Sequence, residues 1–144
     1  MFTLPKDAKI TKVANYAAAS TTDVDSARVD MTGFDTVTFI AAVGDVTNGC
    51  VLQLTAKSNA ADSTSNSTSE KAGTQITAGA TDTDNCLFIV TVHKPTLRYA
   101  YATLAIDTQN AVFENIIAIQ YNAKNVPVTQ PTTVVDNVIG GPNA

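Results

Sequence analysis

His93 is the only histidine of the 144-residue chain, so a triad or dyad that needs a base with a near-neutral pKa would have to use it. It ends an alternating apolar segment and directly precedes Lys94 and Pro95. A solvated or hydrogen-bonded histidine is the ordinary interpretation of such a strand end. The sequence therefore favours a protein that is not an enzyme.

Metal-ligating patterns are equally sparse. A zinc site needs three or four Cys and His ligands, and Cys50, Cys86 and His93 are widely spread. The run 82–85 (DTDN) alternates oxygen side chains as a calcium loop does, but it lacks the central glycine and the bidentate glutamate. Asp and Asn also cap turns with their own side chains, so we expect a turn here, and no metal or other cofactor.

The two cysteines each begin an apolar segment, which is typical of buried thiols. Cys50 and Cys86 could also meet across neighbouring strands, and the sequence leaves that pairing open. A reducing cytoplasm would keep them as thiols.

Acidic residues, glycines and tyrosines offer no clear catalytic arrangement. Glycoside hydrolysis needs two carboxylates facing each other, whereas most acids here fall at predicted strand ends. No GK[ST] phosphate loop occurs. Tyr99 and Tyr101 share one strand face and could present rings to a sugar or a protein. Two tyrosines so placed are more often core or subunit interface, so we take them as interface candidates.

Composition excludes further classes. The net charge is −4 and the nine basic residues are scattered, which argues against a nucleic-acid partner. No apolar run approaches the roughly 20 residues that span a membrane. Pro5, Lys6 and Asp7 stand where a signal peptide needs its apolar core, so we expect a protein made in the cytoplasm and not exported by that route. Only 15% of residues are charged, which suits packing against other protein.

Alternating apolar residues predict an all-β domain of about eight strands, arranged as an antiparallel sandwich, jelly roll or barrel. The expected strands are 10–17, 27–31, 36–43, 50–57, 74–78, 87–93, 98–106 and 112–121. The last three are expected to form an antiparallel meander. Turn dipeptides between 43 and 51 are expected to close a hairpin.

Two segments stand out from this pattern. In 36–43, both faces are apolar or small, which suits a sandwich strand whose second face is partly covered. The stretch 58–73 is polar, has no apolar anchor and is longer than most loops, so it is either mobile or ordered by something else.

The chain divides into a single domain with an N-terminal arm, residues 1–124, and an extended C-terminal arm, residues 125–144. Prolines in the arm prevent regular ladders, yet its apolar residues suggest that it docks on a neighbouring surface, its own or another subunit's. The candidate interface residues of the arm are Val126, Val128, Val134, Val135, Val138 and Ile139.

Several runs resemble small structural proteins of tailed bacteriophages. Lys94–Tyr99 (KPTLRY) is similar to a strand entry of those proteins, and 110–112 and 116–124 continue it. Pro127–Gln130 resembles the tail that follows, and 34–40 with Gly44, Asp45, Val46 and Gly49 resembles the first hairpin. The likeness covers roughly residues 33–130, and it departs in the polar stretch 58–73.

The resemblance implies a capsid decoration, or cement, protein on the outside of a phage head. Such proteins are β-barrel or β-tulip folds, often homotrimers, that clamp major capsid subunits, so the implied partners are the major capsid protein and other copies of the chain. The implied location is the virion surface. Three alternatives stay open: a head–tail joining or tail protein, a carbohydrate-binding jelly roll on the virion, and a hydrolytic enzyme based on His93.

Overall fold

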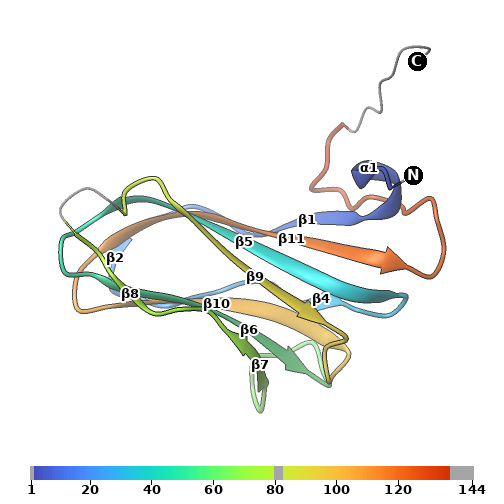
Figure 1. The fold of residues 1–144 in the computed structure, drawn as a ribbon, viewed down its shortest axis with the longest axis horizontal. Helices are drawn as coiled ribbons and strands as arrows, with labels where there is room; N and C mark the ends of the chain where they lie inside the picture. The colour runs from blue at the N-terminus through green and yellow to red at the C-terminus, as the bar shows by residue number, and fades with distance from the viewer. Residues whose placement is uncertain (1, 80–82, 137–144) are drawn as a thin grey trace.

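The computed structural model describes residues 2–79 and 83–136, and within them the chain forms one helical turn and eleven strands (Figure 1). The elements are α1 (Leu4–Asp7), β1 (Lys9–Ala14), β2 (Ala17–Ser20), β3 (Val24–Asp25), β4 (Val29–Asp30), β5 (Phe34–Val46), β6 (Val51–Asn59), β7 (Thr68–Ala72), β8 (Ile76–Thr77), β9 (Leu87–His93), β10 (Tyr99–Asp107) and β11 (Ala111–Ala123). No helix in these residues has the length and apolar character that a membrane crossing needs.

Two antiparallel sheets face each other as a sandwich, which confirms the predicted all-β class. Sheet A has the order β1, β11, β5, β9, with β2 also on β11, and sheet B has the order β3, β10, β6, β7, with β4 on β10 and β8 on β6. We treat β1 with β2, β3 with β4, and β7 with β8 each as one strand and number the resulting eight strands in chain order. Sheet A then has the order 1-8-3-6 and sheet B the order 2-7-4-5. That is the connectivity of a jelly roll, which decides between the architectures left open by the sequence.

Two predicted pairings are wrong. β9, β10 and β11 do not form a meander, because β10 lies in sheet B while β9 and β11 both pair with β5 in sheet A. Likewise β5 and β6 lie in different sheets and form no hairpin. Sheets pack about 10 Å apart and a residue spans about 3.3 Å, so even the link 108–110 is long enough to cross between them. Short links therefore did not imply neighbouring strands.

The polar stretch 58–73 is ordered by sheet B. Its first two residues extend β6, and Thr68–Ala72 form β7 against β6, so only 60–67 connect the two strands. β7 has no buried residue, which is why no apolar alternation revealed it.

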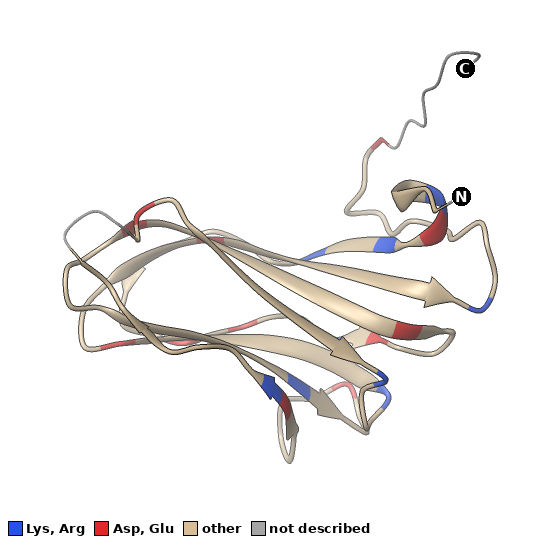
Figure 2. Ribbon diagram, viewed as in Figure 1, with Lys and Arg blue, Asp and Glu red and all other residues tan. Residues whose placement is uncertain are grey.

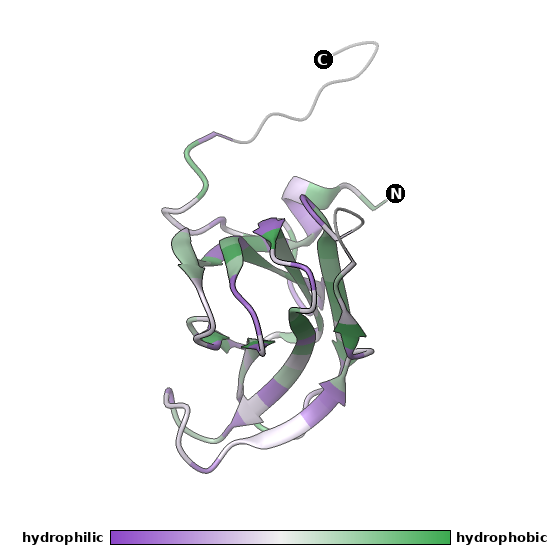
Figure 3. Cartoon of the chain, turned by 90° about the vertical axis from the view of Figure 1, so that its left-hand side faces the viewer, coloured by the Kyte–Doolittle hydropathy of each residue, from purple (hydrophilic) through white to green (hydrophobic). Residues whose placement is uncertain are grey.

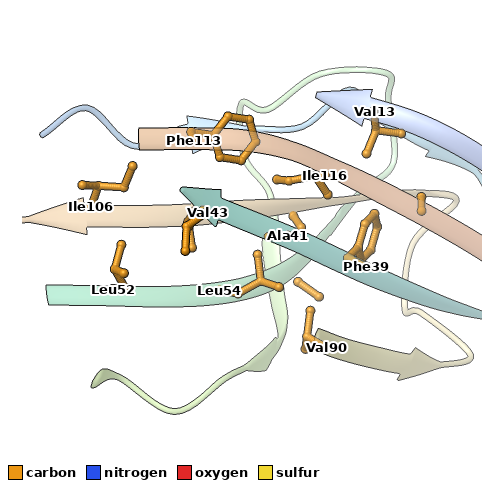
Figure 4. Close-up of a cluster of buried hydrophobic side chains, with 14 of the residues drawn as sticks. Val13, Phe39, Ala41, Val43, Leu52, Leu54, Val90, Ile106, Phe113 and Ile116 are labelled. Atoms are coloured by element: carbon orange, nitrogen blue, oxygen red, sulfur yellow. The ribbon is translucent and has the colours of Figure 1, made fainter. Parts of the chain in front are cut away.

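The core fills the space between the sheets. Every second residue of β5, namely Val37, Phe39, Ala41 and Val43, points inward and is at most 2% exposed. Figure 4 shows Phe39, Ala41 and Val43 with side chains from both sheets: Val13, Leu52, Leu54, Val90, Ile106, Phe113 and Ile116. Burying each such side chain contributes about 1.5–3 kcal/mol relative to exposure. The end-on view of Figure 3 shows two layers whose strands carry most of the hydrophobic residues.

Candidate functional site: the outer face of sheet A

Three isoleucines lie side by side across the outside of sheet A. The register pairs Ile117 of β11 with Ile40 of β5, and Ile40 with Ile89 of β9. Because Phe39 and Ala41 point into the core, Ile40 between them points outward. Ile40 and Ile117 are half-buried, and Ile89 is 62% exposed. The row is an apolar band that opens to solvent at β9.

On β5, β9 and β11 the neighbouring rows are mixed polar and apolar and carry no formal charge, whereas on β1 the exposed Lys12 pairs with Ile117 and borders the band. Thr38 Oγ1 shares hydrogen bonds with Thr91 Oγ1 at 2.7 Å and with the Tyr121 hydroxyl at 3.3 Å. These polar groups already have partners on the sheet, so covering them with another protein costs less than covering unpaired groups. We call this surface the uncharged face; its rows are Asn115–Ala42–Leu87, Ile117–Ile40–Ile89, Ile119–Thr38–Thr91 and Tyr121–Thr36–His93.

The outside of sheet B differs from these three strands of sheet A, because it carries charged residues. Lys57 lies on β6, Glu70 and Lys71 lie on β7, and Asp25 of β3 accepts a hydrogen bond from Thr103 at 2.5 Å. Figure 2 shows the contrast: charged residues mark β1, β6, β7 and strand ends, whereas the central stretches of β5, β9 and β11 carry none. The two outer faces therefore differ in the kind of surface they can bury.

The tyrosine candidates lie on the outside of sheet B and are not equivalent. Tyr99 is half-buried, with the Arg98 guanidinium 5.1 Å from its ring centre. Tyr101 is only 1% exposed, because the turn 60–67 covers it and its hydroxyl donates a hydrogen bond to Ser67 Oγ at 2.7 Å. Tyr101 therefore anchors the chain's own turn and has no free ring for a partner or a sugar.

The described part of the C-terminal arm lies against the N-terminal segment. The Gln130 side chain accepts a hydrogen bond from the Ile10 amide at 2.9 Å and donates to the carbonyls of Pro5 and Ala8. The Val128 amide donates to the Lys6 carbonyl at 2.7 Å. Gln130, which sequence reasoning missed, thus joins the arm to the N-terminal segment together with the Val128 amide.

The valines of the arm differ in exposure. Val126 is 54% and Val135 98% exposed, whereas Val128 and Val134 are half-buried. Val138 and Ile139 lie outside the described residues. As an interface element the arm stays a prediction, now with Val126 and Val135 as its accessible apolar side chains.

The other chemical candidates have structural partners. His93 Nδ1 and Thr36 Oγ1 share a 2.8 Å hydrogen bond, and Asn122 donates to the same Thr36 oxygen at 3.1 Å. Asp84 Oδ1 accepts the Val46 amide at 2.8 Å, as expected of a turn residue, while Asp82 lies outside the described residues.

Two cysteine thiols and one surface ion pair also bear on the chemistry of the described residues. Cys50 is a buried thiol, and burial raises its pKa, while the Cys86 thiol donates a hydrogen bond to the Asp84 carbonyl at 3.4 Å. An ion pair that the sequence analysis missed joins Arg98, which directly precedes β10, to Asp30 of β4 at 2.7 Å. Hydrogen bonds from the Arg98 side chain hold the pKa of Asp30 well below its usual range.

Comparisons with known proteins identify the fold and no family. No protein-family model matches the sequence, and no curated protein matches it. A chain in the structure of infectious bursal disease virus, Gx strain, is similar over 85% of this chain, with a TM-score of 0.54 and 9% sequence identity. The match covers 33% of that viral chain, so this protein spans about a third of its length. At this identity the likeness concerns the fold: the chain shares its sandwich with a chain of a virus structure.

Proposed function

We propose that this protein is a structural component of a virion, and specifically a decoration protein on the outer surface of a tailed-phage head. Its jelly-roll connectivity belongs to a fold used by viral capsid domains, and the fold likeness to a chain of a virus structure agrees with that use. The resemblance of residues 33–130 to phage structural proteins supplies the narrower assignment. The observation that carries the proposal is the uncharged face, a surface suited to permanent contact with protein.

The uncharged face would pack on major capsid subunits. Apolar side chains such as Ile40, Ile89 and Ile117 would supply the stabilising burial, at about 25 cal/mol per Å² of apolar surface. A protein that binds only the assembled lattice stabilises that state by mass action. Charged sheet B would then face solvent, which keeps the particle surface soluble.

The carbohydrate-binding alternative has less support. It relied on two tyrosine rings on one face, and Tyr101 lies beneath the turn 60–67. Tyr99 alone offers a half-buried ring, already contacted by Arg98.

Copy number and a matched pair of variants test the proposal. Mass spectrometry of purified particles should find hundreds of copies in a simple ratio to the major capsid protein; about a dozen would indicate a connector or tail protein, and none would refute a virion role. Ile40→Lys places a charge in the centre of the uncharged face and should abolish particle binding. Ala105→Lys places the same charge on the outside of sheet B and should leave binding intact. Equal effects of both substitutions would refute docking through this face.

A further inference from the structure

β9 is an outermost strand with an open edge. Sheet A ends on β9, and within the described residues no strand pairs with its second side. Its sequence, LFIVTVH, has no charge, no glycine and no proline. By contrast β1 carries Lys9 and Lys12 with a register shift, and β7 carries Glu70 and Lys71 with another. Charges and bulges are what natural proteins use to block edge pairing, and β9 lacks both.

The ladder with β5 determines which backbone groups of β9 are open. The Val43 amide donates to the Cys86 carbonyl at 3.1 Å, and the Lys94 amide donates to the Asp35 carbonyl at 2.6 Å. In an antiparallel ladder every second residue faces the same neighbour, so 88, 90 and 92 bond to β5. The amides and carbonyls of 87, 89, 91 and 93 then point to the open edge. Exposed apolar side chains accompany them, since Leu87 and Ile89 are each 62% exposed.

We propose that β9 pairs antiparallel with β9 of a second copy of this chain, about a two-fold axis through Val90. In this register Leu87 pairs with His93 of the other copy and Ile89 with Thr91, so each open amide and carbonyl meets a partner. On the inner side Val90 meets Val90 and Phe88 meets Val92, all of them apolar. A two-fold contact must be self-complementary in this way.

Charge at the strand ends also favours a second copy in this orientation. Asp84 precedes β9 and Lys94 follows it. Antiparallel pairing brings Lys94 of one copy close to Asp84 of the other at both ends of the contact, whereas parallel pairing would place like charges together. A hollow of about 380 Å³, lined by Leu54, Ile76 and Phe88, opens beside the same edge, and the second copy would lie next to it.

The pairing is independent of the proposed function and differs from the homotrimer implied by the resemblance. Sedimentation equilibrium of the full chain, over a range of concentrations, should therefore give twice the 15.0 kDa monomer mass. A monomer or a trimer at all concentrations would overturn the proposal, whatever the result for particle binding.

Two double variants test the register. Ile89→Lys/Thr91→Lys places like charges directly opposite each other on both sides of the axis, and should weaken the dimer about tenfold or more. Ile89→Lys/Thr91→Glu changes the same positions but places opposite charges across the axis, so this variant should dimerise. Equal dimerisation of both variants would refute this register. Thermal unfolding of each variant serves as the control that both remain folded.

Hydrogen exchange gives a direct readout in the unmodified protein. Dilution should speed exchange of the amides of Leu87, Ile89, Thr91 and His93, which the second copy protects. The amides of Phe88, Val90 and Val92 should stay protected at every concentration, since they bond to β5. Concentration-independent exchange at the first four would overturn the pairing.

Discussion

Tyr101 offers the sharpest test of how the polar segment after β6 is held. Its ring lies on the outside of sheet B, yet it is 1% exposed because the turn 60–67 covers it. The hydroxyl donates to Ser67 Oγ at 2.7 Å, and the Lys57 ammonium lies 5.9 Å from the ring centre. If this interpretation is right, Tyr101→Ala should destabilise the protein and release the turn.

The magnitude follows from what is removed. Truncating a buried aromatic ring costs about 3–5 kcal/mol, and we expect about 3 kcal/mol here because the exposed turn 60–67 can settle into the space. Tyr101→Phe removes only the hydroxyl, and half-buried Ser67 can turn to water, so about 1 kcal/mol is expected. Tyr99→Ala is the matched control on the same strand face; its ring is half-buried, and it should cost about 1 kcal/mol or less.

Urea unfolding measures these differences. With a slope of about 2 kcal/mol per M, the midpoint should fall by about 1.5 M for Tyr101→Ala and about 0.5 M for Tyr101→Phe. Limited proteolysis should cut within 60–67 faster in Tyr101→Ala than in Tyr99→Ala. Equal midpoints for Tyr101→Ala and Tyr99→Ala, with equal cleavage, would refute the anchoring role.

Three further predictions concern the arm, the ion pair and the thiols. Gln130→Ala removes the side chain that joins the arm to the N-terminal segment and should speed proteolysis of residues 124–136, whereas unchanged cleavage would show that the arm is held otherwise. Asp30 has a lowered pKa, so its ion pair with Arg98 stabilises the fold above the unfolded pKa of about 4 and loses that effect as the pH falls towards the folded pKa. The stability gap between the wild type and Asp30→Asn should therefore shrink in acid; because both side chains are substantially exposed, it should be under about 1 kcal/mol at pH 7. In the native protein a thiol reagent should leave Cys50 unmodified, and denaturation without reductant should reveal two thiols; fewer than two would contradict the reduced state of both cysteines.

Alternation predicted strands well and pairings poorly, for a physical reason. The period of two in β5, β6 and β10 follows from burial of one face, so Phe39, Leu54 and Leu104 could be assigned to the core from the sequence. Alternation contains no information on which strand lies alongside, and links of three to five residues serve a hairpin or a crossing between sheets equally well. The meander and the hairpin were therefore wrong although their strands were right.

The uncharged face was partly visible in the sequence. Apolar or small residues on both sides of 36–43 predicted a second covered face, and 116–119 (IIAI) shows the same two-sided pattern. Only the strand order of the jelly roll shows that this second face is the outer face of sheet A, on the side away from the core. Gln130 and Asp30 left no signal, because each acts through a partner about 70 to 120 residues away in the chain.

The size of the uncharged face connects the two proposals. Its three strands, about 4.8 Å apart and about seven residues long at about 3.4 Å each, cover roughly 340 Å² in projection. Specific interfaces bury about 800 Å² on each partner, so one copy offers less than half of that. The proposed pairing through β9 would join two such faces in one continuous sheet of roughly 700 Å², with Leu87 and Ile89 of both copies at its centre. Each proposal has its own test, but if both hold, the dimer would offer a capsid surface about twice the area that one copy offers.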